Sequence, residues 1–293
     1  MCIRDRKSIL PRIRSSSEVY GHVRRRGPLP GVAISGILGD QQAAAFGQAC
    51  LAPGEAKISY GTGNSLLLNV GAEPAKPADG LISTVFYRLA DEEPVYALEG
   101  SIAVTGLAVR WLRDNMGFFN SSDDIEALAA EVEDNGGVYF VPAFSGIMAP
   151  RWREDARGTI VGLTRFANRN HIARAALEAT AYQTREVAEA MRKQADVQLK
   201  TVKVDGGMTE NKLLMQFQAD MLNCPVVRGE LRENASLGTA YAAGLAVDFW
   251  SSTDEIRANW IPSDMWTPHM DQKTREELFH NWNKAVERSL NWA

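Results

Sequence analysis

The chain has 293 residues, which is long enough for two domains of typical size or for one large domain with part of another. Hydrophobic residues make up 45% of it and charged residues 23%, which are ordinary globular values and argue against disorder, collagen-like repeats and a coiled coil. The net charge is −4, yet residues 1–26 carry eight Lys and Arg against two acidic residues, which leaves −10 for the rest of the chain.

Hydrophobic periodicity divides the chain into an α/β series without an internal repeat. A buried strand, a tight turn and a helix come first, at residues 30–38 and 41–50. Short β-rich runs separated by turn residues predict an antiparallel meander at residues 56–60, 65–70, 81–89 and 95–98. The later expected elements are helices at 102–113, 122–133, 171–192, 210–222, 235–249 and 272–290, and strands at 137–141, 201–204 and 225–228. This order predicts a mixed β-sheet flanked by helices.

Two of these helices have patterns that predict their packing. Residues 171–192 carry an apolar stripe at intervals of three or four residues, so this longest helix should lie flat on the sheet. Residues 235–249 are rich in Ala and Gly, and we expect these small side chains to allow close approach to the sheet. Residues 272–290 have one apolar face and form an amphipathic closing helix.

The basic start of the chain is interpreted as an ordinary basic surface. Arg24, Arg25 and Arg26 could contact phosphate, and an Arg- and Ser-rich start could be a transit peptide. Prolines and Glu18 interrupt any amphipathic helix there, which argues against the transit peptide. Residues 1–6 have no start signal of their own and are interpreted as an assembly scar.

The sequence gives no signal for a membrane span, a nucleic-acid site or a zinc site. The best apolar run, residues 237–247, is shorter than the roughly 18 residues that a span needs. The seven tryptophans do not interleave with basic residues as a single-strand nucleic-acid site would require. Cys2, Cys50 and Cys224 are far apart without a CxxC pair, and the four histidines form no motif, which predicts a reducing, cytoplasmic environment.

Asp40 is the first candidate for chemistry. It stands where a strand ending in Gly39 gives way to a helix, and open α/β sheets bind ligands at such strand ends. A carboxylate there can accept the proton of a substrate hydroxyl that attacks a phosphoryl group, while Gln41 orients a neighbouring hydroxyl. On this residue alone, an N-cap of the helix is the preferred interpretation.

Two glycine-rich turns are candidate phosphate contacts. Residues 60–64 (YGTGN) join two β-rich runs, and such a hairpin can turn its N–H groups and the Thr62 hydroxyl toward a phosphate, or be a plain hairpin turn. Residues 202–207 (VKVDGG) run from a strand into a Gly pair that leaves room for a nucleotide. Asn211, one turn into the following helix, has an amide that can pair with an adenine edge. A Gly-Gly turn alone is weak evidence for a site.

Gly100 and Gly106 bracket the start of the helix expected at 102–113. Glycine inside a helical pattern costs about 1 kcal/mol against Ala, which indicates close packing or the approach of a ligand. Close packing is the preferred interpretation.

The order of these features is more specific than any one of them. A strand-end Asp, a Gly-Thr-Gly hairpin and an Asp-Gly-Gly turn before an Asn-bearing helix resemble the carbohydrate kinases of the FGGY family. Residues 158–163 (GTIVGL), followed by residues 171–178, are similar to that family's carboxyl-domain signature. Further stretches are most similar to the glycerol kinases within the family: 15–21 (SSSEVYG), 39–43 (GDQQA), 60–63 (YGTG), 96–100 (YALEG), 141–144 (VPAF), 181–185 (AYQTR) and 215–218 (MQFQ).

The resemblance implies an α/β, actin- and hexokinase-like ATPase fold of RNase H-like domains that close on a cleft. It also implies transfer of the γ-phosphoryl group of ATP to a terminal hydroxyl of glycerol, with Asp40 as general base and glycerol ligand and Gln41 beside it. Thr62 would contact the terminal phosphates. The nucleotide site would be lined by Gly106, Gly207 and Asn211. Mg²⁺ would bridge phosphate oxygens and neutralise developing charge.

Two positions depart from the pattern of the glycerol kinases. Ser65 stands where Phe is usual, which would remove an apolar wall of the polyol pocket and leaves the substrate open. Arg110 stands where a Gln usually contacts the nucleotide. We assign Arg110 to the nucleotide site, where its charge would reach the ribose or a phosphate.

Members of this family carry a long segment upstream that holds the first phosphate loop and further glycerol contacts. We therefore expect residues 1–48 to be the end of an N-terminal domain and residues 49–293 to be the C-terminal nucleotide-binding domain. The chain is interpreted as a C-terminal fragment with little or no activity of its own, because half of the cleft is absent. The full-length kinase is expected to be a homo-oligomer.

Two rival functions remain open. The first is a kinase in the same family for another polyol or a ketose such as xylulose. The second is a non-catalytic, actin-like nucleotide-binding module, which would bind ATP without needing a base at Asp40.

Overall fold

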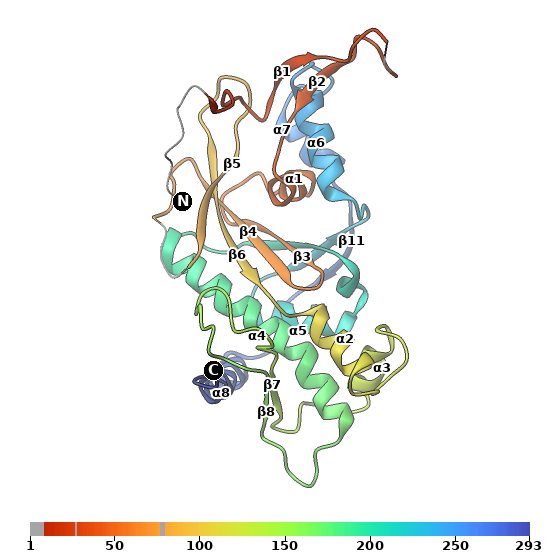
Figure 1. Cartoon of the computed structure of the whole chain (residues 1–293), viewed down its shortest axis with the longest axis vertical. Helices are drawn as coiled ribbons and strands as arrows, with labels where there is room; N and C mark the ends of the chain where they lie inside the picture. Colours follow the sequence, from red (N-terminus) through yellow and green to blue (C-terminus); the bar gives the residue numbers. More distant parts are fainter. Residues whose placement is uncertain (1–8, 27, 77–79) are drawn as a thin grey trace.

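The computed structural model describes residues 9–26, 28–76 and 80–293 (Figure 1). Its centre is a seven-stranded sheet with the strand order β11-β10-β9-β3-β4-β6-β5. The strands are β3 (Glu55–Tyr60), β4 (Asn64–Gly71), β5 (Ile82–Tyr87), β6 (Val95–Ile102), β9 (Thr201–Asp205), β10 (Val226–Gly229) and β11 (Pro262–Trp266). Residues 1–6, which the sequence predicts to be an assembly scar and which include Cys2, lie outside the described residues.

The sheet is mixed, as the sequence predicts. Neighbouring strands from β3 through β4 and β6 to β5 are antiparallel, which confirms the meander. β9 pairs in parallel with both β3 and β10, and β11 closes the far edge antiparallel to β10. The parallel pairs join the early meander to the alternating helices and strands of the second half of the chain.

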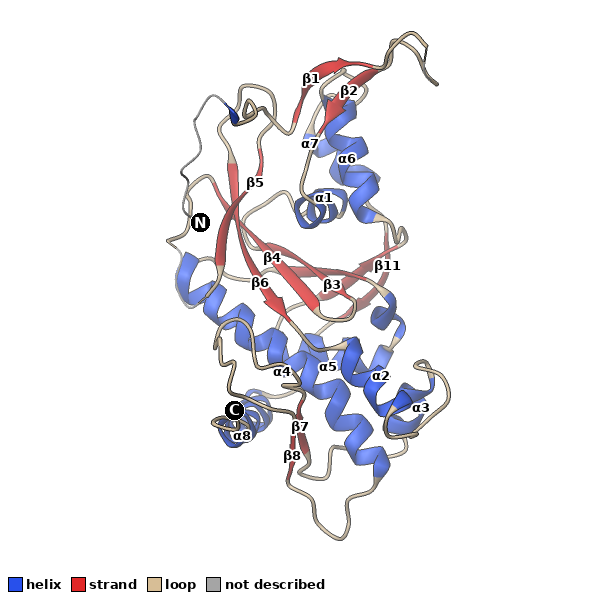
Figure 2. Cartoon of the chain, viewed as in Figure 1, coloured by secondary structure: helices blue, strands red, loops and turns tan. Residues whose placement is uncertain are grey.

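Helices cover both faces of the sheet (Figure 2). They are α1 (Asp40–Gly47), α2 (Gly106–Asp114), α3 (Asp124–Ala130), α4 (Arg169–Ala195), α5 (Lys212–Leu222), α6 (Asn234–Leu245), α7 (Thr253–Asn259) and α8 (Gln272–Arg288). The long helix α4 lies across the sheet and contacts β4 and β6, so the expectation that it packs flat on the sheet is confirmed. α1 contacts β3 and β4 from the opposite face.

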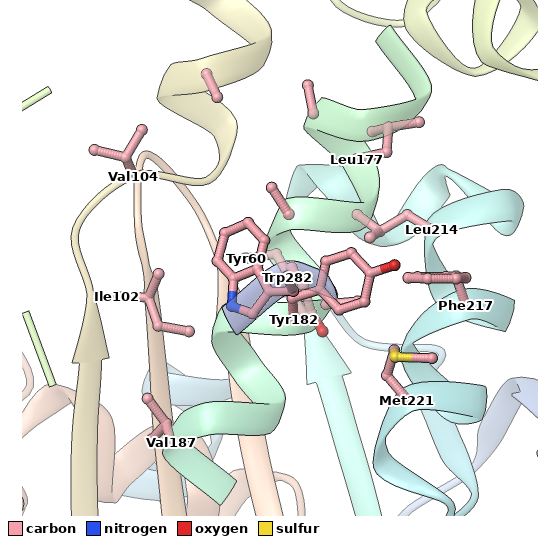
Figure 3. Packing of buried hydrophobic residues seen from close by; sticks show 14 of the residues in the cluster. Tyr60, Ile102, Val104, Leu177, Tyr182, Val187, Leu214, Phe217, Met221 and Trp282 are labelled. Carbon is pink, nitrogen blue, oxygen red and sulfur yellow. The ribbon is translucent and has the colours of Figure 1, made fainter. Parts of the chain in front are cut away.

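The alternation of side chains along β3 separates the two faces of the sheet. Ala56, Ile58 and Tyr60 belong to the larger apolar core beneath α4. Tyr60 there packs near Tyr182 and Trp282, whose rings stack 5.3 Å apart (Figure 3). We call this side the α4 face of the sheet, and the opposite side the α1 face.

Two small sheets lie outside the central one. β1 (Ser17–His22) and β2 (Ala33–Gly36) form an antiparallel pair that contacts α6, and β7 (Tyr139–Val141) and β8 (Thr159–Val161) form another that contacts α8. The strands expected at 30–38 and 137–141 are both shorter in the structure. β1, β8, α7 and β11 are not predicted from the sequence.

The close approach of α6 is to the helix α1 and to the strand β2, not to the central sheet, which corrects the expectation for residues 235–249. α6 packs against α1, and a Cβ atom at Gly238 would lie 1.8 Å from the backbone oxygen of Ala43. Conversely, a Cβ at Gly47 would lie 2.1 Å from the backbone oxygen of Asn234. Glycine on both helices lets their backbones touch, because any side chain would hold them apart.

Two other helix predictions need new boundaries. Ile102 still belongs to β6, so the helix expected at 102–113 begins only at Gly106. The helix expected at 210–222 begins at Lys212 as α5, and a short 3₁₀ helix, η2 (Gly207–Glu210), precedes it. None of the helices in the described part of the chain is both long and apolar enough to cross a membrane.

Candidate active site

A cavity of about 590 Å³ lies between the β3–β4 hairpin, α2, α3 and η2. Five residues that the family resemblance assigns to a nucleotide site all lie in the lining of this one cavity. They are Thr62, Gly106, Arg110, Gly207 and Asn211. The cavity has the size that a small-molecule site requires.

The hairpin at residues 60–64 carries the first of these residues. Its backbone turns between β3 and β4, with the Gly61 N–H donating to the carbonyl of Gly63 at 3.0 Å. The carbonyl of Thr62 accepts from the N–H groups of Thr105 and Leu107 at the start of α2. These bonds fix the hairpin against α2 and leave the Thr62 side chain exposed at the cavity.

Arg110 reaches this hairpin from the first turns of α2. One guanidinium nitrogen, Nη2, donates to the hydroxyl oxygen of Thr62 at 2.7 Å. The side chain is otherwise exposed and lines the same cavity. A guanidinium held at the hairpin has further donors for a phosphate or a ribose oxygen.

The glycines at and near the cavity differ in what a side chain would meet at their positions. A Cβ at Gly106 would lie 2.4 Å from the carbonyl oxygen of Gly61, and one at Gly100 would lie 2.4 Å from Val187, so close packing is confirmed as their main role. Gly206 has a φ of 96° and a Cβ there would meet the carbonyl of Tyr60 at 2.1 Å. Gly207 differs, because a Cβ there would meet nothing within 4 Å. Its surroundings are open, so a ligand can approach the backbone there.

Asn211 is the N-cap of α5, not a residue one turn into the helix as the sequence analysis expects. Its side-chain oxygen accepts from the N–H of Leu214 at 2.8 Å. The side chain is 9% exposed and lines the cavity. Because the oxygen is engaged in capping, the amide nitrogen is the part of the group that can serve a ligand.

The cavity also has an apolar wall that the sequence analysis missed. It consists of Val109, Ile125, Leu177 and Met208, which come from α2, α3, α4 and η2. Apolar side chains on such a wall can hold the flat face of a base by dispersion and by exclusion of water. No sequence signal marks these residues, because apolar side chains in helices are usually interpreted as core.

Asp40 and Gln41 lie outside this cavity, at the first turn of α1. Gly39 is the N-cap of the helix and Asp40 is its first residue, so the N-cap interpretation of Asp40 is wrong. The Asp40 side chain is exposed, and its carboxylate accepts from the Gln41 backbone N–H at 2.9 Å and from the Gln41 side-chain amide at 3.2 Å.

A row of polar side chains crosses the α1 face of the sheet between these two places. Ser59 in β3 is paired in register with Asp205 in β9 and with Ser65 in β4, and Ser65 is paired with Ser101 in β6. All four are half-buried. Ser65 also donates to a carboxylate oxygen of Glu99 at 3.4 Å. The polar row therefore forms a hydrophilic floor between α1 and the hairpin.

Asp205 is the acidic member of this floor. Its Oδ2 atom accepts from the side-chain amides of Gln48 at 2.8 Å and Asn234 at 3.1 Å. Among residues 9–26, 28–76 and 80–293, no group of three or more His, Cys, Asp or Glu side chains is arranged to hold a metal ion.

Comparison with known proteins agrees with this geometry. Residues 56–247 match the FGGY family of carbohydrate kinases, C-terminal domain. The chain is 62% identical over 290 residues to a glycerol kinase of Nocardia farcinica, an alignment that covers 97% of this chain and 58% of that protein. It is 64% identical over 284 residues to a glycerol kinase of Azorhizobium caulinodans, covering 97% of this chain and 57% of that protein.

A solved structure shows the same fold. The crystal structure of Plasmodium falciparum glycerol kinase with ADP superimposes with a TM-score of 0.93 at 40% sequence identity, over 97% of this chain and 57% of that one. The chain thus spans less than three-fifths of the length of each of these relatives. The fold is the α/β, actin- and hexokinase-like type expected from the sequence. On these grounds the chain belongs to the FGGY family of carbohydrate kinases.

Proposed function

We propose that this chain supplies the nucleotide site and the general base of an ATP-dependent glycerol kinase, which converts glycerol to glycerol 3-phosphate. The observation that carries the proposal is the convergence of Thr62, Arg110, Gly207 and Asn211 on one cavity. The identity to glycerol kinases, 62% and 64% in the two relatives, supports glycerol as the substrate.

In this proposal, Asp40 acts as the general base. Its exposed carboxylate accepts the proton of a terminal hydroxyl while that oxygen attacks the γ-phosphorus of ATP, and ADP leaves with the electrons of the broken bond. Gln41 lies beside Asp40 and offers its amide to a neighbouring hydroxyl.

The nucleotide would occupy the cavity, with its base against the apolar wall. Thr62 and Arg110 contact the terminal phosphates, and Gly207 lets the backbone approach the phosphate chain. Mg²⁺ brought with ATP would neutralise the charge that builds up on the phosphates during transfer. The charge and the donors of Arg110 at the hairpin fit a triphosphate.

Three further assignments belong to the same proposal. Residues 1–48 correspond to the end of an N-terminal domain and residues 49–293 to the C-terminal nucleotide-binding domain. The match of residues 56–247 to the C-terminal domain of the family supports this division. We also infer that the complete kinase is cytoplasmic and forms a homo-oligomer.

The test is ATP turnover with glycerol, measured by coupling ADP formation to a detectable reaction. We would compare the 293-residue chain with a chimera that adds the upstream region of the Nocardia farcinica glycerol kinase at its N-terminus. We expect turnover in the chimera and little or none in the chain alone, because positioning of both substrates carries most of the catalysis.

Other outcomes overturn parts of the proposal. A chimera that prefers a pentulose such as xylulose to glycerol would reject glycerol as the substrate, and the small polar Ser65 on the floor is the feature that favours this alternative. Equal turnover in both proteins would show that residues 1–293 hold a complete site. Binding of ATP without turnover of any polyol would support a non-catalytic nucleotide-binding module as the function.

The nucleotide site is tested separately, by calorimetric titration of the 293-residue chain with ADP. We expect Gly207→Val to weaken ADP binding at least about tenfold, because its side chain would enter space that the ligand needs. Gly21→Val is the matched control, since Gly21 also has no atoms within 4 Å of its Cβ position but lies in β1, away from the cavity. Equal ADP affinity of Gly207→Val and Gly21→Val would show that the nucleotide binds outside this cavity.

A further inference from the structure

Two lysines are buried side by side in the central sheet. Lys57 in β3 is paired in register with Lys203 in β9, and both side chains are on the α1 face. Lys57 is 0% exposed and Lys203 is 5% exposed. Burial lowers the pKa of both amines, because an ammonium ion loses its hydration there. Each therefore needs specific partners to remain inside the protein.

Lys203 has the partners of a lysine that supports the fold. Its Nζ atom donates to the backbone carbonyls of Gln48 at 2.7 Å and Ala49 at 3.0 Å. These carbonyls follow the last residue of α1, where a positive charge is favourable with respect to the helix dipole. The ammonium also lies 4.2 Å from the ring centroid of Trp260. These contacts hold together α1, β9 and the segment after α7.

Lys57 has different partners, and both are side chains. Its Nζ atom donates to the Oε1 atom of Gln41 and to the hydroxyl of Ser59, the latter at 3.0 Å. Neither bond goes to a backbone group, so neither one supplies a donor to a backbone carbonyl at a helix end or in a strand. The nearby groups that act on the charge of Lys57 are Asp205, Glu99, Cys50 and Asp40. Asp205 belongs to the polar floor, Glu99 accepts from Ser65 of that floor, and Asp40 lies in the first turn of α1.

The bond from Lys57 fixes which way the Gln41 amide points. An ammonium group can only donate, so the Gln41 atom facing it must be the oxygen. The amide nitrogen then faces Asp40 and donates to its Oδ2 atom at 3.2 Å. A flipped amide would place N–H groups against the ammonium and an oxygen against the carboxylate, and both contacts would be repulsive.

We propose that Lys57 is a positioning residue, which orients the Gln41 amide and through it holds the Asp40 carboxylate in the conformation that accepts the substrate proton. This inference rests on the proposed function for the role of Asp40, but the hydrogen-bonded series from Lys57 through Gln41 to Asp40 is a property of the chain itself. Lys57 is fully buried and its ammonium donates only to side chains, and burying a charged group in this way is costly unless it holds another group in place.

The kinetic test uses the chimera with the Nocardia farcinica upstream region and the variant Lys57→Met. We expect kcat for glycerol phosphorylation to fall about tenfold or more, the loss typical of a hydrogen bond to a charged group, with the KM for ATP within about twofold of the parent. Lys203→Met is the matched control, because it removes an equally buried lysine from the same face. We expect Lys203→Met to lower Tm and to leave kcat per folded molecule within about twofold of the parent value.

A double-mutant cycle separates positioning from a general structural effect. In a Gln41→Ala background, Lys57→Met should have little further effect on kcat, because the group through which it acts is gone. The same fractional loss in both backgrounds would overturn the proposal, and so would an equal loss in Lys203→Met. If Lys57→Met does not fold, the same double-mutant cycle is measured with Lys57→Gln, which keeps a hydrogen-bond donor at this position.

A spectroscopic measurement tests the inference without turnover. In the 293-residue chain, the side-chain amide resonances of Gln41 should shift in Lys57→Met and stay in place in Lys203→Met. Unchanged Gln41 resonances in Lys57→Met would overturn the inference. A chimera that does not phosphorylate glycerol while these resonances still shift would instead reject the proposed function and keep the positioning.

Discussion

On the face of the central sheet that α4 covers, β3 presents Ala56, Ile58 and Tyr60, whereas on the α1 face the same strand presents Lys57 and Ser59. The α4 face is continuous apolar core, in which Tyr182 and Trp282 fill the space between α4 and α8. The α1 face is apolar only beneath the body of α1, around Phe46 and Leu67, and becomes polar toward the hairpin.

The difference shows how one strand can serve both the fold and the site. Because side chains alternate between faces, a residue can be chosen for the site without disturbing the core behind it. Substitutions on the α4 face should therefore change stability, and those on the polar part of the α1 face should change turnover. The effects expected for Asp40→Asn and Leu98→Ala test this division.

The largest expected effect is on turnover, from Asp40→Asn on the α1 face. Removal of a general base should lower kcat of the chimera by roughly 10²- to 10⁴-fold, with ADP affinity largely unchanged. Asp40 is exposed, so Tm should stay within about 1 °C of the parent. Asp91→Asn, which changes another exposed carboxylate between β5 and β6, is the control. Undiminished turnover in Asp40→Asn would reject Asp40 as the general base.

Leu98→Ala on the α4 face should have the opposite signature. Leu98 in β6 is fully buried and paired in register with Leu68, so the truncation should cost about 2–5 kcal/mol of unfolding free energy. Urea denaturation followed by circular dichroism measures this loss, and Val85→Ala, at a side chain that is 49% exposed, should cost less than about 0.5 kcal/mol. A large loss of kcat per folded molecule in Leu98→Ala would contradict the division between the faces.

Gly238→Ala tests the contact behind the α1 face. The new methyl group would meet the backbone of Ala43, so α6 must move away from α1, at a cost of about 1–3 kcal/mol. The parent and Gly21→Ala, where the Cβ has open space, provide the comparison in the same urea experiment. Stabilisation of Gly238→Ala by its better helix propensity would show that the helices are not in backbone contact.

Much of the fold could be predicted from the sequence because its signals are local. The apolar stripe of residues 171–192 predicts α4, and short β-rich runs separated by turn residues predict β3, β4 and β6. The segment that forms β11 (PSDMW) escapes prediction because it has no alternation and begins with Pro. The small residues of α6 indicate a close approach, but a sequence does not say whether a helix or a sheet is the partner.

The candidate site shows a similar limit. The residues of the cavity are found through their resemblance to a family, and the structure supplies the spatial convergence that no spacing could show. The N-cap interpretation of Asp40 fails because Gly39 takes that position with its backbone alone. Lys57 was missed because a lysine in a strand usually faces solvent, and only the register with β9 and the position of α1 show that it is enclosed.

The smallest expected effect concerns two thiols, one behind each face. Cys50 belongs to the apolar cluster of the α1 face and Cys224 to the core of the α4 face. Burial raises the pKa of each thiol to about 12 from an ordinary 9.0. Because the folded-state pKa is the higher one, their contribution to stability is fully present below pH 9 and is lost as the pH rises from 9 toward 12.

At pH 9 the free energy of unfolding should therefore be lower by about 0.4 kcal/mol for each thiol than at pH 7, because half of the unfolded thiols are ionised at pH 9 while the folded ones are not. Urea unfolding of Cys224→Ala against the parent between pH 7 and 10 measures the difference in slope. Iodoacetamide labelling at pH 8, read by peptide mass spectrometry, should modify both thiols only after unfolding. Labelling of Cys50 but not Cys224 in the folded chain would show that the α1 face opens to solvent while the α4 face stays closed.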